Sequence, residues 1–174
     1  NKCASIPICT DLNEYNTVFP KSTETVTVSG SHQGTLETRC YIYVKINYEK
    51  YNFHLYGTHL DVASEATRTE QILNIINDAK KHDDVNDVVF IMGDFNTFNA
   101  KDKMYGMKDE LWNTNWTKNN GSVVEALENN NFHDLELNYI ITNQINKVEM
   151  TTWNNTRVDF IFSNKIPVIY KIDR

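Results

Sequence analysis

The sequence lacks several features that would place it in a familiar class at once. No apolar run approaches the roughly 20 residues that a helix needs to cross a bilayer. The composition, 40% hydrophobic and 23% charged, predicts a globular chain. The dinucleotide motif GxGxxG, the P-loop and the serine-hydrolase motif GxSxG do not occur, which argues against these three kinds of site. Residues 1–5 lack the apolar core of a signal peptide, so any such peptide is expected to have been removed already.

Cysteine and positive charge are also scarce. The three cysteines are Cys3, Cys9 and Cys40, and none has the spacing of a CxxC or Cys/His metal motif. Cys3 and Cys9 are close enough for a small disulfide loop, which would leave Cys40 to pair outside this chain; the alternative is three reduced thiols. The net charge of −6 argues against a nucleic-acid coat protein. It leaves open an enzyme that meets phosphodiesters in a local cleft.

Residues 42–46 and 51–58 predict a β-hairpin, because apolar and polar side chains alternate in both. A shorter strand is predicted over 23–28. His59 ends the second hairpin strand on the same face as Phe53 and Leu55. If that face is the core face, the strand delivers an imidazole at its C-terminal end; the alternative is a hydrogen-bonded structural histidine.

Residues 64–81 predict an amphipathic helix, capped by Ser64 or Thr67. Arg68 lies off its apolar stripe and is expected to be solvated, and the basic residues 80–82 suit the C-terminal end of the helix dipole. The stripe itself is expected to face the core and consists of Ile72, Ile75, Ile76 and Ala79.

The apolar run Val88–Met92 predicts a strand that is buried on both faces. It stops at Gly93-Asp94-Phe95-Asn96. On extended backbone Asp94 and Asn96 point to the same side, where a carboxylate and a carboxamide can position a water or hold a phosphoryl oxygen. Gly93 has no Cβ, so a ligand or a second strand can approach closely. The alternative is an ordinary turn, in which Gly, Asp and Asn are common.

The later segments are predicted less sharply. Residues 97–121 are loop-like, with a possible short helix around Met104, and 122–129 predict a short helix with a serine cap. Residues 157–162 and 166–172 predict strands. In the first of these strands Asp159 points away from the apolar face. Arg157 lies two residues away on the same face as Asp159 and is one expected partner.

Three segments occur in a specific order: Gly57-Thr-His-Leu-Asp61, Ile91-Met-Gly-Asp-Phe-Asn96 and Arg157-Val-Asp-Phe-Ile-Phe162. Together they closely resemble the endonuclease/exonuclease/phosphatase superfamily, the DNase I-like hydrolases. Glu37-Thr38-Arg39 fits the same pattern. The match runs from about Arg39 to Ile172, with a poor fit over 97–150.

The resemblance implies an α/β (α+β) fold, a four-layer α/β/β/α sandwich that is incomplete in this chain. Residues 1–174 would form the later part of one such domain. The implied activity is hydrolysis of phosphoesters with Mg²⁺, or with Mn²⁺ or Ca²⁺. Implied substrates are DNA or RNA, inositol phosphates and sphingolipids. The acidic balance of the chain favours none of them.

The resemblance also implies roles for single residues. Asp94 would orient or deprotonate the attacking water, through the metal that it helps to bind. Asn96 would hold a phosphate oxygen, with Arg39 nearby. His59 would donate a hydrogen bond to the phosphate or act as an acid. Asp159 would orient a second histidine.

Two parts of the family pattern have no counterpart here. No residue in 1–36 fits the family's main metal-binding Glu, and the sequence stops before the expected Ser-Asp-His strand. Missing flanks or a partner chain are therefore expected to complete the fold, and the chain alone would be inactive. The alternative function is a non-catalytic extracellular binding or structural module on the same fold.

A secreted location is expected from the possible disulfide and from the many secreted members of the family. The chain also carries three glycosylation sequons. Because asparagine is abundant, about three sequons are expected by chance, so they add no evidence for secretion. They begin at Asn115, Asn120 and Asn154.

Overall fold

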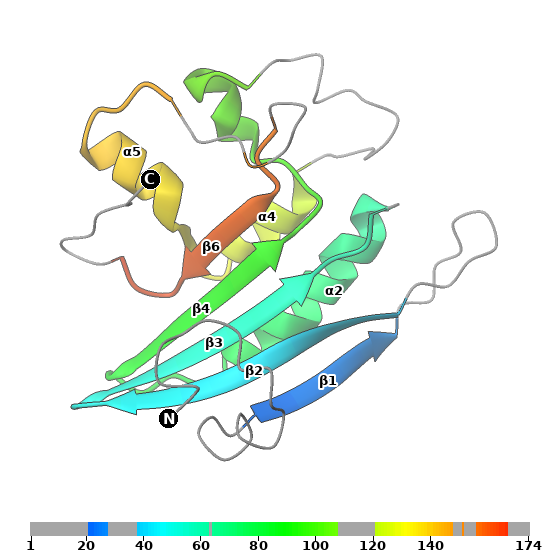
Figure 1. Ribbon diagram of the computed structural model, residues 1–174, viewed down its shortest axis with the longest axis vertical. Helices are drawn as coiled ribbons and strands as arrows, with labels where there is room; N and C mark the ends of the chain where they lie inside the picture. Colours follow the sequence, from blue (N-terminus) through cyan, green and yellow to red (C-terminus); the bar gives the residue numbers. More distant parts are fainter. Residues whose placement is uncertain are drawn as a thin grey trace, which may run out of the picture.

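The computed structural model describes residues 21–27, 38–62, 64–107, 121–147, 151 and 156–166. Within them one mixed sheet has the strand order β1-β2-β3-β4-β6-β5, and α2 and α4 lie behind it in Figure 1. The elements are β1 (Lys21–Thr27), β2 (Thr38–Tyr48), β3 (Tyr51–His59), α2 (Glu65–Ala79), β4 (Asp87–Asp94), the 3₁₀ helix η1 (Ala100–Tyr105), α4 (Ser122–Glu128), β5 (His133–Asp134), α5 (Leu135–Thr142) and β6 (Asp159–Ser163).

The predicted hairpin and the central strand are confirmed. β1, β2 and β3 pair antiparallel in sequence order, and β3 then pairs parallel to β4. A parallel neighbour requires a crossover connection, which α2 supplies. β6 returns antiparallel to β4 from much later in the chain. The predicted mixture of α and β structure around an inner sheet is therefore present.

Helix α2 forms where its pattern predicts. The Ser64 side chain accepts a hydrogen bond from the Thr67 backbone N–H, so Ser64 is the cap. Arg68 is not solvated as expected: it is fully buried and ion-paired with Glu65. His82 was expected only to suit the C-terminal end of the helix dipole, but its ring also stacks on the ring of His54. The predicted apolar stripe is buried and consists of Ile72, Ile75, Ile76 and Ala79.

One face of the sheet packs against α2 and α4. Strand residues at the centre of this core are Tyr56, Ile91 and Phe162. Phe53, Leu55 and His59 point to the opposite face, because side chains alternate along a strand. Phe53, Leu55 and His59 share one face, as the alternation predicts, and that face is not the helix-covered one.

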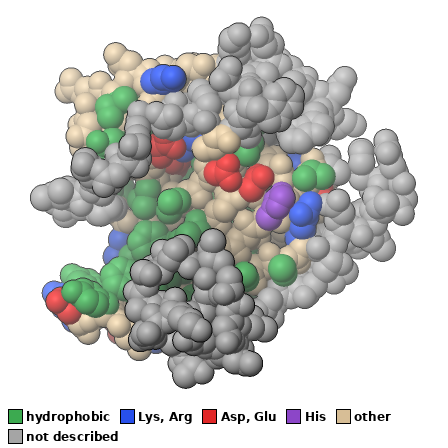
Figure 2. Space-filling model, in the orientation of Figure 1, with side chains coloured by type: hydrophobic (Ala, Val, Ile, Leu, Met, Phe, Trp, Pro, Cys, Tyr) green, Lys and Arg blue, Asp and Glu red, His purple; other side chains and the backbone are tan. Residues whose placement is uncertain are grey.

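The opposite face keeps apolar side chains partly exposed. Ile42 is 48% and Ile161 49% exposed, and Phe90 and Met92 are only partly buried. The prediction that 88–92 is buried on both faces therefore fails for this chain. Figure 2 shows hydrophobic side chains gathered on this face, next to acidic, basic and histidine side chains. We call this surface, comprising Ile42, Val44, Phe53, Leu55, Phe90, Met92 and Ile161, the open face.

Three expectations lie outside the described residues. They are the Cys3–Cys9 loop, the strand over 166–172 beyond Ile166, and the sequons at Asn115, Asn120 and Asn154. Cys40 is described and is an exposed free thiol. None of the helices in the described part of the chain is both long and apolar enough to cross a membrane.

Arg157 holds the segment before β6 to two other elements. Its fully buried guanidinium contacts Asp102 at 2.7 Å and Asp134 at 2.6 Å, and Glu136 at 3.4 Å. It also stacks over the Phe160 ring, 4.4 Å from the centroid. The expected Arg157–Asp159 pair does not form, because Arg157 points into this acidic cluster and Asp159 is exposed.

Replacing Arg157 with Met should lower the free energy of unfolding by about 3–5 kcal/mol, because two buried carboxylates lose their counter-charge. Urea denaturation measures this. The matched control is Lys101→Met, which breaks the exposed pair with Glu128 and should cost less than about 1 kcal/mol. Equal losses in the two variants would contradict the structural role of Arg157.

Candidate functional site

Three predicted site residues lie in one row across the sheet. In the strand register His59 is opposite Asp94, and Asp94 is opposite Asp159. Neighbouring strands are about 4.8 Å apart and facing residues share a face, so the three side chains project together. His59 Nε2 lies 3.6 Å from Asp94 Oδ2, with the two side chains 55% and 32% exposed. The row is thus accessible to a ligand.

A surface hollow of about 350 Å³ adjoins this row. Its lining includes Arg39, Thr58 and His59. Arg39 and His59 therefore both border this hollow. A guanidinium and an imidazole facing one hollow offer hydrogen-bond donors to an anion.

Gly93 allows the strands to meet closely at the site. Its φ is +136°, and a Cβ built on it would lie 1.9 Å from the Thr58 carbonyl oxygen. The sequence left open whether a ligand or a second strand approaches Gly93; here it is strand β3. The parallel pairing that aligns His59 with Asp94 depends on this missing side chain.

The chain turns immediately after Asp94. Asp94 Oδ1 accepts a hydrogen bond from the Asn96 backbone N–H at 2.8 Å, and Asn96 has a φ of +48°, a conformation that Asn tolerates well. Extended backbone was expected to place Asn96 and Asp94 on the same face. Because the chain turns here, the two side chains do not share a face. Asn96 is only 4% exposed, and its Nδ2 donates to the Leu60 carbonyl. The motif is a strand that ends in a side-chain-stabilised turn.

A buried ion pair joins the loops that follow β3 and β4. Glu65 accepts hydrogen bonds from Arg68 and from the Thr97 hydroxyl. Arg68 also donates to the Asp61 carbonyl, and the Leu60 N–H donates to the Asp94 carbonyl. These contacts fix the two loops relative to each other, so Asp94 has a rigid support.

Sequence reasoning missed Glu65 and Thr97, and misplaced Arg68. The available signal was the i, i+3 spacing of Glu65 and Arg68 in the first turns of the helix. Hydrophobic patterning does not reveal it, because both side chains are charged and nevertheless buried.

The row offers oxygen ligands that suit a hard divalent cation. Mg²⁺ is commonly held by one or two carboxylates together with waters and substrate phosphate oxygens. Asp94 and Asp159 face each other from adjacent strands and are both at least partly exposed. This donor set fits Mg²⁺, although the metal-binding Glu that the resemblance implies has no counterpart in the sequence.

Solved structures with a similar fold are found. An endonuclease/exonuclease/phosphatase family protein from Leptotrichia buccalis C-1013-b matches 83% of this chain and 48% of its own length, at 21% identity and a TM-score of 0.50. The fold is that of the DNase I-like proteins. A second family protein, from Bacteroides thetaiotaomicron, matches 82% of the chain and 49% of its own length, at 13% identity and a TM-score of 0.52.

A mannosyl-6-phosphatase from Bacteroides thetaiotaomicron VPI-5482 matches 82% of the chain and 51% of its own length, at 12% identity and a TM-score of 0.50. The chain thus spans about half the length of these DNase I-like structures. No family model matches the sequence, and no curated protein matches it. At these identities the likeness concerns the fold, which agrees with the resemblance noted from the three motifs.

Gly93→Ala should destabilise the protein by about 3 kcal/mol, because the new Cβ meets the Thr58 backbone and the φ of +136° is strained for alanine. Thermal unfolding measures the loss. Gly57→Ala is the matched control: it lies on β3, where a Cβ meets nothing within 4 Å, and should change stability by less than about 0.5 kcal/mol. If both variants behave alike, the close approach at Gly93 is not a constraint.

Proposed function

We propose that the protein containing this chain is a divalent-metal-dependent phosphoesterase. The observation that carries the proposal is the register that sets His59, Asp94 and Asp159 side by side, next to the hollow that Arg39 lines. The DNase I-like neighbours support it, since they include a protein named as a phosphatase. Phosphoryl transfer depends on in-line placement and on charge stabilisation, and this row supplies groups for both.

Each residue of the row has a proposed role. Asp94 orients the attacking water and takes up its proton, because its carboxylate is held by the turn yet remains accessible. His59 donates a hydrogen bond to the phosphate from beside Asp94. Arg39 compensates the phosphate charge from the hollow. Asp159 orients a second histidine contributed from outside the described residues.

Asn96 has a more limited role in this proposal than an exposed amide would have. One of its two amide hydrogens is used by the Leu60 carbonyl. Its remaining N–H is the group available to a phosphate oxygen. Its backbone N–H, bonded to Asp94 Oδ1, makes it a positioning residue for that carboxylate as well.

The proposed cofactor is Mg²⁺, held by Asp94 together with groups from outside this chain. When bound, the ion would polarise the phosphoryl group and offset its negative charge. The roles of His59 and Arg39 do not depend on the identity of the ion, because both act by hydrogen bonding and charge.

We further propose that the open face is covered by a second sheet, from flanking sequence or a partner chain. Ile42 and Ile161 remain about half exposed, and a contiguous apolar surface of this kind marks an interaction site. The solved neighbours are about twice as long as the chain. Residues 1–174 would then be the later part of one sandwich domain.

The competing function is a non-catalytic binding or structural module on the same fold. Asp94→Asn, made in the longest natural form of the protein, separates the two. We expect Mg²⁺-dependent hydrolysis to fall by roughly 10²–10⁴-fold with unchanged thermal stability. Substrates to assay are a generic phosphodiester, DNA, inositol phosphates and sphingomyelin.

The control for that experiment is Asp83→Asn, which removes an exposed carboxylate outside the row and should leave the rate unchanged. Full activity of Asp94→Asn would rule out the proposed role of Asp94. Absence of turnover by the unmodified long form with every substrate would favour the binding module.

The Ile161→Lys variant tests whether a second sheet covers the open face. In the longest natural form it should lower stability by about 2 kcal/mol or more, because it buries a charge between two layers. In the 174-residue chain alone the same change should be near neutral, since Ile161 is half exposed. Ile141→Lys on α5 is the control, exposed by 56%. Equal effects of Ile161→Lys in both forms would contradict a covering layer.

A further inference from the structure

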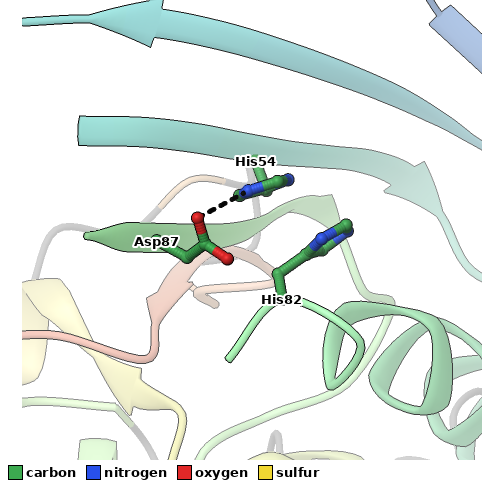
Figure 3. A group of neighbouring side chains, drawn as sticks. All are labelled: His54, His82 and Asp87. Carbon is green, nitrogen blue, oxygen red and sulfur yellow. Dashed lines mark ion pairs between the residues drawn. The ribbon is translucent and has the colours of Figure 1, made fainter. Parts of the chain in front are cut away.

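A second group of possible metal ligands lies at the other end of the sheet. His54 belongs to β3, Asp87 begins β4, and His82 lies in the turn after α2 (Figure 3). One ligand atom from each lies within 4.8 Å of the others, and no other such group of three occurs in the described parts of the chain. The proposed catalytic function does not use any of these residues.

His54 carries the observation that points to a ligand. The residue is 2% exposed. Its Nδ1 lies 2.8 Å from the Tyr43 hydroxyl, but the buried Nε2 has no hydrogen-bond partner among the described residues. Nε2 lies 3.4 Å from Asp87 Oδ1 without hydrogen-bond geometry. Buried polar atoms are rarely left unsatisfied, and a cation between Nε2 and the carboxylate would satisfy both.

The proton positions around His82 leave one of its nitrogens free for a metal. The Tyr56 oxygen lies 3.0 Å from Asp78 Oδ2 and 2.9 Å from His82 Nε2. Burial raises the pKa of Tyr56, so the phenol keeps its single proton. A carboxylate can only accept, so Tyr56 donates to Asp78 and His82 Nε2–H donates to Tyr56. In a neutral His82 the lone pair is therefore on Nδ1.

This arrangement resembles the outer shell of known metal sites. Metal-binding histidines typically donate their second N–H to an oxygen that fixes the ring. His82 does so through Tyr56, whose hydroxyl is in turn anchored on Asp78. With a metal on Nε2, His54 would donate its Nδ1–H to Tyr43 in the same way.

Asp87 is held in place and charged. Its Oδ1 accepts from Asn52 Nδ2 at 2.8 Å and its Oδ2 from the Asp84 N–H at 3.3 Å. Burial alone would raise the pKa of Asp87, but the hydrogen bond from Asn52 and the nearby His54 ring keep it below its ordinary value. Burial lowers the pKa of both histidines.

We propose that His54, His82 and Asp87 bind a transition-metal ion of the Zn²⁺ class, with water as a fourth ligand. Two imidazoles and one carboxylate suit Zn²⁺ and disfavour Mg²⁺ or Ca²⁺, which prefer oxygen ligands. Tetrahedral bonds of about 2.0–2.1 Å place ligand atoms about 3.3 Å apart. The present spacing of up to 4.8 Å must therefore contract, and the stacked rings must tilt to converge.

The proposed metal site would stabilise the fold and would take no part in the proposed phosphoester hydrolysis. His54 and Asp87 precede His59 and Asp94 by five and seven residues on the same two strands, a separation of roughly 17–23 Å along the sheet. They also face the helix-covered side. An ion there would tie the end of the α2 crossover to the starts of β3 and β4.

Zinc binding to the protein carrying the whole chain, stripped with chelator and dialysed, tests the proposal. A competition titration with a chromogenic chelator should show a site that takes up Zn²⁺, and Co²⁺ should give the visible spectrum of a tetrahedral centre. At a hundredfold excess of Zn²⁺ over its Kd, Tm should rise by roughly 5–10 °C. Mg²⁺ should produce no such rise.

His82→Gln is the decisive variant, because His82 is only partly buried and the fold can be checked by circular dichroism. It should weaken zinc binding at least tenfold and abolish the Tm rise, and Asp87→Asn should do the same. The control His133→Gln should bind zinc as the unmodified protein does. No zinc binding, or binding that survives both His82→Gln and Asp87→Asn, would overturn the proposal.

Discussion

The parallel pairing of β3 with β4 is the constraint on which the rest of the structure depends. It places His59 opposite Asp94, and β6 then adds Asp159 on the other side of Asp94. Because side chains alternate along a strand, a slip of one residue would turn Asp94 to the helix-covered face and leave His59 without its neighbour. The sequence permits the pairing at this end only because Gly93 lets the Thr58 backbone come close.

Buried polar contacts secure this register at both ends of the two strands. Near the candidate site, the Glu65–Arg68 pair and Thr97 connect the loops that leave β3 and β4. At the far end Asp87 accepts from Asn52, its neighbour in the register, and lies beside His54. Apolar packing alone would tolerate small sliding, whereas these hydrogen bonds have directional geometry. The candidate site and the proposed metal site are thus opposite ends of one structural unit.

Local sequence patterns predicted the helices and strands well. They could not predict which side chains pair with residues elsewhere in the fold. The α2 stripe, its Ser64 cap and the hairpin follow from periodicity within a few residues. Arg157 and Arg68 were misplaced because their carboxylate partners are chosen by tertiary packing, not by sequence distance. Asn96 was misplaced because extended backbone was assumed where the chain turns. His59, Asp94 and Asp159 were all named from the motifs, yet only the register shows that they are neighbours.

The choice of sheet face follows from what each face packs against. In this chain α2 and α4 cover the side that carries Tyr56 and Ile91, and the alternation along β3 places Phe53 and Leu55 on the other side. Asp94 and Asp159 project from the same face as Ile161. A layer that covers the apolar side chains of the open face must therefore end beside the two carboxylates. Groups from such a layer would border the hollow, and under the proposed function they would complete the site around the two carboxylates.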